Sequence, residues 1–288
     1  MVIFMSHYSV LVLTDEDTCV DELLAPYDEN IKVAPYIAFT KDELIAKEKR
    51  DIKKYKEGIY AEFLKDPEGY KEKHSNNPDH LHYVEHEFRK KLYWTNARIY
   101  KEAIRYYDPE DITEDGSVLS TYNPNSKWDW YVEGGRFSGM LKLKVPEGVD
   151  PEEFYDENGE YTDSAYAEEI DFSPDKEEYN NAIRFWELIV EGAKPETEDE
   201  EQMQKFYNAE YYKKRYSSKE EYAEEVSRFS TWAILTPDGV WHEPGKMGWF
   251  ACHNASIEDE KSFKDNYQSF IDKAIENNWL VTVVDCHI

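Results

Sequence analysis

Two apolar runs lie near opposite ends of this 288-residue chain. Residues 9–13 read Ser-Val-Leu-Val-Leu, and residues 280–284 read Leu-Val-Thr-Val-Val. Short runs of this kind, largely apolar and rich in β-branched residues, are typical of central strands that are covered on both faces. We therefore expect the N-terminal and C-terminal strands to share one sheet.

Other segments complete an α+β pattern. Thr40 and Glu43 form a capping box before a helix at about residues 41–56, and residues 263–275 carry apolar side chains at helical spacing. The Pro-Asp-Gly turn at residues 237–239 predicts a hairpin. The sequence predicts an α+β fold whose mixed or antiparallel sheet contains both terminal strands.

The negative charge is concentrated in one part of the sequence. The formal net charge of the chain is −28. Residues 147–201 contain 21 acidic and 3 basic residues, a net charge of −18, whereas residues 41–105 have a net charge of +3. With the change in composition near residue 146, this predicts two parts. Residues 1–146 and 229–288 would form an α+β core domain, and residues 147–228 an acidic, mainly helical insertion.

Charge and composition limit the classes of function. The excess of carboxylates argues against direct binding to nucleic acid, because phosphate contacts come mainly from Lys and Arg, and it favours a basic protein partner. No segment approaches the ~20 apolar residues of a membrane helix, so we expect no membrane association. Cys19, Cys252 and Cys286 are odd in number and lack CxxC spacing, which is typical of reduced thiols in a cytoplasm.

The most distinctive stretch is residues 123–139, which is rich in Trp and contains Gly-Gly-Arg. Its aromatic residues can form a recognition surface or anchor a strand corner, with Arg136 tied to Asp129. Arg136 can also clamp the phosphate or carboxylate of a small molecule. The Gly pair is not a phosphate loop, because neither Gly-Lys-Ser/Thr nor GxGxxG is present. The interface candidates here are Trp128, Asp129, Trp130, Tyr131 and Arg136.

Histidine, cysteine and aspartate residues near the C-terminus could supply a general base or a zinc site. Neighbouring residues of a strand point to opposite faces, so just one of Cys286 and His287 can enter a shared site. Because these C-terminal residues contain no HxxxH, HExxH or CxxC pattern, we expect no metal and no cofactor. Four histidines within residues 74–86 favour a polar connector over a metal site. The residues of the alternative enzyme site are Arg136, His242, Asp285 and His287.

Five stretches together carry a resemblance to a known group of proteins. They are residues 5–13, 24–30, 123–139, 236–242 and 284–288. The chain resembles a widespread family of bacteriophage-encoded proteins that begin with Met-Ser-His and share a Lys-Trp-Asp-Trp-Tyr and Gly-Gly-Arg element. The resemblance spans nearly the whole chain and implies that Met5 is the natural start, with residues 1–4 an upstream extension. Phe137 stands where this family often has a tryptophan.

The resemblance implies an origin in a phage, and phage accessory proteins of this size and acidity are often inhibitors of host antiviral systems. We expect a non-enzymatic homo-oligomer in the host bacterial cytoplasm. It would bind stoichiometrically to a host defence protein or nuclease complex, such as a CRISPR effector or Gabija. Its acidic region would contact a basic surface there and imitate the charge of nucleic acid. The acidic interface candidates are Glu196, Glu198, Asp199, Glu200 and Glu201.

Two alternatives remain open at this point. In the first, the chain is an enzyme that acts on a nucleotide, where Arg136 holds phosphate and His242, Asp285 or His287 moves protons. This alternative requires these residues to meet in one pocket. In the second, the chain is a sponge that sequesters a small immune signalling nucleotide against its aromatic stretch.

Overall fold

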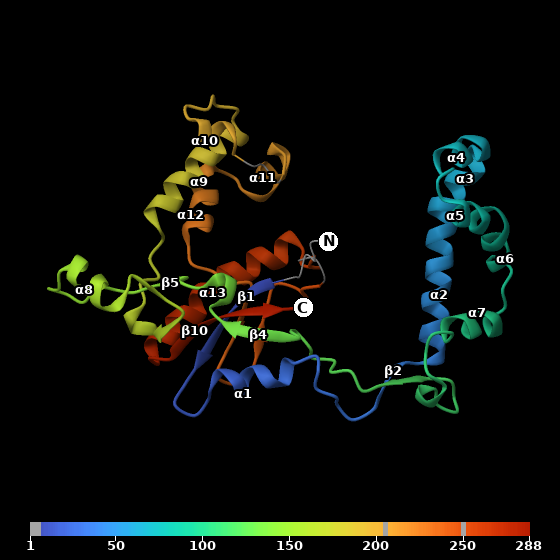
Figure 1. Ribbon diagram of the computed structural model, residues 1–288, viewed down its shortest axis with the longest axis horizontal. Helices are drawn as coiled ribbons and strands as arrows, with labels where there is room; N and C mark the ends of the chain where they lie inside the picture. Colours follow the sequence, from blue (N-terminus) through green and yellow to red (C-terminus); the bar gives the residue numbers. More distant parts are fainter. Residues whose placement is uncertain (1–6, 204–206, 249–251) are drawn as a thin grey trace. The chain divides into compact units, whose positions relative to one another are not determined.

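The computed structural model describes residues 7–203, 207–248 and 252–288 (Figure 1). Met5 and residues 1–4 lie outside the described residues. The chain forms two compact units, called here unit 1 (Met1–Ile31 and Asn123–Ile288) and unit 2 (Lys32–Tyr122). In the described part of the chain, no helix is both long and apolar enough to cross a bilayer.

Unit 1 is built on a six-stranded sheet in which the first and last strands of the chain pair. The six strands are β1 (His7–Thr14), β4 (Trp130–Glu133), β7 (Ser164–Tyr166), β8 (Ala233–Leu235), β9 (Trp241–His242) and β10 (Leu280–His287). β1 and β10 are antiparallel along their full length, with His7 opposite His287. On its other edge β1 pairs with β8 in parallel, and β8 forms the expected hairpin with β9. The α+β class and the mixed sheet with both terminal strands are confirmed.

The side chains of β1 and β10 alternate between two buried faces. Leu11 and Val283 lie on one face, in a core cluster with residues of helix α13 (Ile257–Glu276). Val10 lies on the other face, in a second cluster with residues of helix α1 (Val20–Leu24). Figure 1 shows α13 and α1 on opposite sides of these strands. Cover on both sides explains why the two terminal runs are apolar at successive positions.

The acidic residues 147–228 belong to unit 1 and do not form a separate unit. Within this segment β7 pairs with β10, so that Ser164 lies opposite Thr282. A second, two-stranded sheet joins β5 (Leu141–Lys142) to β6 (Tyr161–Thr162). The segment is mainly helical, and one of its strands completes the main sheet.

The helical part of this segment has a small core of its own, in which Trp186, Val190 and Tyr212 are buried. Each of its helices begins at a Ser, Thr, Asp or Asn cap or follows a strand directly. These helices are α8 (Pro151–Asn158), the 3₁₀ turn η6 (Ala167–Glu169), α9 (Lys176–Ile189), α10 (Glu198–Glu201), α11 (Ala209–Arg215) and α12 (Lys219–Ser227).

Unit 2 is mainly helical. Its first helix, α2 (Lys41–Tyr55), begins with the expected capping box of Thr40 and Glu43. Its core contains Phe63 and Phe88, and two strands, β2 (Tyr36–Phe39) and β3 (Val118–Ser120), pair at its ends. The other helices are η2 (Lys56–Tyr60), α3 (Ala61–Lys65), α4 (Pro67–Lys73), α5 (Pro78–His82), η3 (Tyr83–Glu87), α6 (Phe88–Lys91), α7 (Asn96–Ala103) and η4 (Pro109–Asp111).

Candidate functional site

One face of the β1–β10 ladder changes from apolar to polar at the end where β1 begins and β10 finishes. Leu11 and Val283 are paired in register, then Ser9 and Asp285, then His7 and His287. Because alternate residues of a strand share a face, the last two pairs lie on the face that α13 covers further along. Antiparallel pairing of the two terminal strands thus places two histidines side by side.

Each histidine is held by a carboxylate. Nδ1 of His7 lies 2.7 Å from Oδ1 of Asp285, and Nδ1 of His287 lies 2.5 Å from Oδ1 of Asp129. The two imidazole centroids are 5.1 Å apart, and Asp285 is 1% exposed. A carboxylate only accepts hydrogen bonds, so each Nδ1 carries the hydrogen and donates it. In a neutral ring the lone pair then lies on Nε2.

Trp130, on the neighbouring strand β4, forms a wall of this cluster. Its ring stacks on His287 at 5.1 Å with an interplanar angle of 14°, and its edge-to-face contact with His7 has a centroid distance of 5.2 Å. Trp130 is 39% exposed. Nε2 of His287 is buried and has no hydrogen-bond partner among the described residues. An unpaired buried polar atom of this kind is uncommon in folded proteins.

The Gly-Gly-Arg turn is fixed to the same cluster. Gly134 and Gly135 have φ values of +67° and +55°, which side chains disfavour. A Cβ on Gly135 would lie 2.6 Å from Oδ2 of Asp285. The backbone N–H of Arg136 donates to that oxygen at 2.9 Å, so Asp285 connects the turn to His7. The guanidinium of Arg136 is exposed and makes no ion pair or hydrogen bond within the described residues, and the expected tie between Arg136 and Asp129 is absent from them.

The other two aromatic candidates are held inside unit 1. Trp128 is 7% exposed and lies in the core cluster on the α1 face, where its Nε1–H donates to the carbonyl of Leu24 at 3.2 Å. The hydroxyl of Tyr131 donates to Asp21, and burial together with this carboxylate raises the pKa of Tyr131. Trp128 is therefore a structural residue, and the exposed part of the stretch is limited to Trp130, Arg136 and their neighbours.

His242 does not join the cluster. It lies on β9, which is separated from β10 by β1 and β8, a distance of about 14 Å at the usual strand spacing. There it lines an open groove of about 510 Å³ beside α13, where burial lowers its pKa. Asp285 and His287 of the alternative enzyme site are brought together, and Arg136 is adjacent through its backbone, but the histidine that lies beside them is His7. His7 was not among the residues predicted from the sequence, although its even spacing from Ser9 and Leu11 places it on the same strand face.

The cysteines and the remaining histidines form no metal site among the described residues. Cys286 points to the opposite face from His287, as the alternation predicts, and burial raises the pKa of its thiol. Cys19 and Cys252 are exposed. In unit 2, His82 and His86 have their rings 5.1 Å apart, each beside a glutamate.

The acidic candidates lie on exposed parts of unit 1. Of the 21 carboxylates in residues 147–201, 17 are exposed, and two of these 17, Glu160 and Glu196, lie within 4 Å of a Lys or Arg nitrogen among the described residues. Seven of the exposed carboxylates lie in residues 147–160, on and beside α8, and five lie in residues 191–201, around α10. The other five lie on η6 and at the start of α9. Figure 1 shows α8 and α10 apart from each other, so the two larger stretches of the chain form two acidic surfaces on unit 1.

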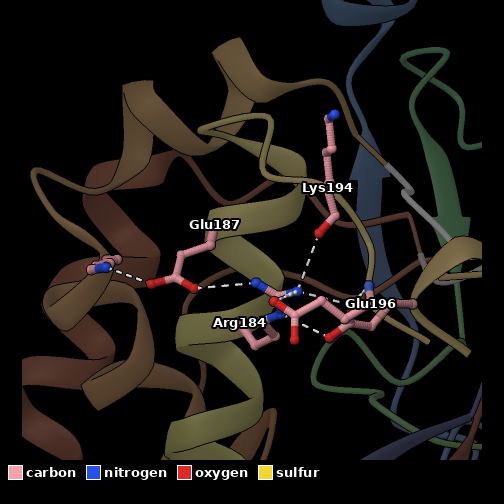
Figure 2. Close-up of polar contacts among 6 residues, drawn as sticks. Arg184, Glu187, Lys194 and Glu196 are labelled. Carbon is pink, nitrogen blue, oxygen red and sulfur yellow. Dashed lines mark hydrogen bonds and ion pairs between the residues drawn. The ribbon is translucent and has the colours of Figure 1, made fainter.

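Glu200, in contrast, is paired, because it binds Arg184 of α9 with both carboxylate oxygens. The two N–O distances are 2.7 and 2.9 Å. Arg184 also donates to the carbonyl of Lys194 at 3.3 Å (Figure 2). The hydrogen bonds from Arg184 lower the pKa of Glu200 to about 2. Glu200 thus anchors α10 to α9, as Glu196 does less closely at 3.5 Å. The free acidic residues of α10 are Glu198, Asp199 and Glu201.

In comparisons of the chain with protein-family models, curated proteins and solved structures, nothing matched. The stretches that carry the phage resemblance nevertheless meet in space. The N–H of Lys127 donates to the carbonyl of Tyr27 at 2.8 Å, and the hydroxyl of Tyr27 donates to the carbonyl of Gly239 at 2.7 Å. With β1 and β10, this gathers parts of all five stretches within unit 1, around the sheet that carries the paired histidines.

Proposed function

We propose that the chain is a bacteriophage inhibitor that binds stoichiometrically to a basic surface of a host antiviral defence protein or nuclease complex. It would act in the cytoplasm of the infected bacterium, as a homo-oligomer and without catalysis. The observation that carries the proposal is the exposure of the carboxylates in residues 147–201, nearly all of them without a cationic partner among the described residues.

The distribution of charge between the two units supports this proposal. By count of acidic and basic residues, unit 1 has a net charge of −27 and unit 2 a net charge of −1. A field of one sign accelerates association with a partner of opposite sign and rejects partners of the same sign. A defence nuclease must present Lys and Arg to bind phosphates, so its nucleic-acid site is a surface of the required kind.

Apolar contacts would supply most of the affinity, because exposed ion pairs contribute little each. Tyr161 and Tyr166 are about half exposed, at 49% and 50%, on β6 and β7 close to α8 in the chain. Aromatic residues beside carboxylates are a combination that fits a protein interface. We therefore place the contact with the partner on α8 and the strands that follow it, with α10 as a second acidic surface.

The test begins with a pull-down from host lysate and a titration of the purified partner against two charge-reversal variants. One variant changes the α8 carboxylates (Glu152→Lys, Glu153→Lys, Asp156→Lys), and the other changes the α10 carboxylates (Glu198→Lys, Asp199→Lys, Glu201→Lys). A control with the same change of charge alters exposed residues of unit 2 (Glu72→Lys, Glu110→Lys, Glu114→Lys).

We expect the α8 variant to slow association and weaken binding strongly, the α10 variant to do so less, and the control to have little effect. Raising the salt from 0.1 M to 1 M should weaken wild-type binding, because the screening length falls from about 10 Å to about 3 Å. The proposal is contradicted if binding survives both reversals and high salt, or if no host protein is retained.

A further inference from the structure

Unit 2 contains a basic stretch within this acidic chain. Residues 88–107 include six basic residues and one acidic residue, a net charge of +5, whereas the chain as a whole carries −28. The stretch spans helices α6 and α7. A charge is largely screened beyond about 8 Å at physiological ionic strength. The local surface of unit 2, and not the net charge of the chain, therefore decides what this stretch attracts.

The cations of α7 lie on one side of the helix. Arg98, Lys101 and Arg105 are spaced at i, i+3 and i+7, which places them on the same face. All three are exposed, whereas Ile99 is buried. Arg105 belongs to a further turn after α7, in which its backbone N–H donates to the carbonyl of Glu102 at 3.1 Å. We call the three cations the basic stripe.

The basic stripe has few carboxylate partners. Arg98 and Lys101 make no ion pair within the part of the chain that the structure describes, and Arg105 has one contact with Glu102 at 3.7 Å. The side chain of Arg105 is 61% exposed, and an exposed ion pair of this kind contributes little. All three cations are therefore available to an external anion.

Aromatic side chains flank the basic stripe at both ends. The guanidinium of Arg98 lies 5.2 Å from the ring centroid of Trp94, and that of Arg105 lies 5.3 Å from the ring centroid of Tyr106. Tyr106 is 87% exposed, and Tyr93, next to Trp94 in the chain, is 79% exposed. An exposed ring beside a cation can stack on a nucleobase while the cation binds the phosphate.

From this arrangement we infer that the basic stripe and its flanking aromatic residues form a binding surface for single-stranded nucleic acid. The cations would contact phosphates, and Tyr93 and Tyr106 would stack on bases. A single strand fits better than a duplex, because the faces of its bases are open to aromatic side chains. An acidic protein would pair with the cations but would leave the exposed rings without a planar partner.

This inference goes beyond the proposed function, which rests on the acidic surfaces of unit 1. An inhibitor with both features would contact a host protein through unit 1 and nucleic acid through unit 2. The α8 and α10 charge reversals should leave the binding of nucleic acid unchanged. Loss of the basic stripe should leave binding to a purified host partner free of nucleic acid unchanged. Each idea can therefore fail without the other.

The experiment measures fluorescence anisotropy of labelled probes with the purified full chain. The probes are oligo-dT and oligo-U of about twelve nucleotides, a DNA duplex of the same length, and an oligo-glutamate of about twelve residues. We expect binding to oligo-dT, oligo-U or both, and weaker binding to the duplex and to oligo-glutamate. The logarithm of the binding constant should fall with the logarithm of the salt concentration with a slope of about −2, because three contacted phosphates contribute about −0.7 each on a single strand.

A variant without the charges of the basic stripe should bind weakly and lose most of this salt dependence (Arg98→Gln, Lys101→Gln, Arg105→Gln). The matched control removes three exposed lysines of unit 2 that form no ion pair among the described residues (Lys54→Gln, Lys56→Gln, Lys65→Gln). Figure 1 shows α3, which carries Lys65, at the opposite end of α2 from α7. The control should therefore bind like the wild type. Circular dichroism of each variant verifies that it is folded.

The aromatic contacts have a test of their own. Tyr106→Ala and Tyr93→Ala should each weaken binding of the single strand about 5- to 150-fold, the range that stacking on one base supplies. Tyr106→Phe keeps the ring and should bind within about twofold of the wild type, because stacking needs the face of the ring and not its hydroxyl.

The inference is overturned if neither oligo-dT nor oligo-U binds at about 50 mM salt, where phosphate contacts are strong. It is also overturned if the folded variant without the basic stripe binds like the wild type, or if both tyrosine-to-alanine variants retain wild-type affinity. Binding of oligo-glutamate as tight as that of the oligonucleotides overturns it as well, and would indicate a surface for an acidic protein instead.

Discussion

Replacing Gly135 by alanine should destabilise unit 1 through two separate effects. Gly135 has a φ of +55°, and an L-residue in the left-handed region costs about 1–2 kcal/mol. The new Cβ would also lie 2.6 Å from Cβ and Oδ2 of Asp285 and 2.7 Å from Cγ1 of Val132. Relief of such overlap by shifts of packed atoms costs about 1–3 kcal/mol. The expected loss is roughly 2–5 kcal/mol, a large part of the stability of a typical domain.

Urea unfolding followed by tryptophan fluorescence measures this loss, because seven of the eight tryptophans belong to unit 1. Gly148→Ala is the matched control, since Gly148 has a φ of +83° and no atom within 4 Å of its added Cβ. It should show the backbone cost alone, about 1–2 kcal/mol. If Gly135→Ala is no more destabilising than Gly148→Ala, the turn does not press on Asp285 and our account of the Gly pair is wrong.

Three further predictions concern the core, the thiols and the acidic loop. Leu11→Ala should lower the free energy of unfolding by about 2–5 kcal/mol in the same urea assay, because the Leu11 side chain is fully buried. A loss below about 1 kcal/mol would contradict a central role of Leu11 in the core. A thiol reagent should modify the exposed Cys19 and Cys252 in the native protein and Cys286 after denaturation, because Cys286 is buried and burial raises the pKa of its thiol. Rapid labelling of all three cysteines in the native protein would refute this. Since its native pKa is lowered to about 2, Glu200 should anchor α10 fully above its ordinary pKa of 4.5 and lose this role as the pH falls toward 2. Amide exchange in α10 should therefore rise in acid, and Arg184→Met should raise it already at neutral pH.

Much of the fold follows from local patterns. The apolar runs of β1 and β10, the capping box of α2 and the Pro-Asp-Gly hairpin depend on neighbouring residues, and the structure has all of them. The division of the chain does not follow from the sequence in the same way. The expected boundary followed charge, which responds to solvent exposure, whereas the observed units reflect long-range packing. β7 illustrates the difference, because this three-residue strand has no clear pattern but pairs with β10.

The candidate site was predictable in part. Asp285 and His287 were both named as candidates from the sequence, and as alternate residues of β10 they share one face of the strand. Trp128 and Trp130 are also two positions apart but do not share a face. A bend at Asp129 separates them, so that Trp128 is buried near α1 while Trp130 packs beside His287 on the opposite face. His7 could be assigned to the site once the antiparallel register of β1 and β10 was known.

The position of β10 also has a consequence for synthesis of the protein. β10 lies between β4 and β1 in the sheet, and its contacts with β1 span 278 residues in the chain. Contacts of such long range form late and slow the folding of a domain. During translation, until residues 280–287 have been synthesised, β1 has no partner strand on the edge that β10 occupies in the folded protein. The histidine pair can assemble only after residues 280–287 have left the exit tunnel.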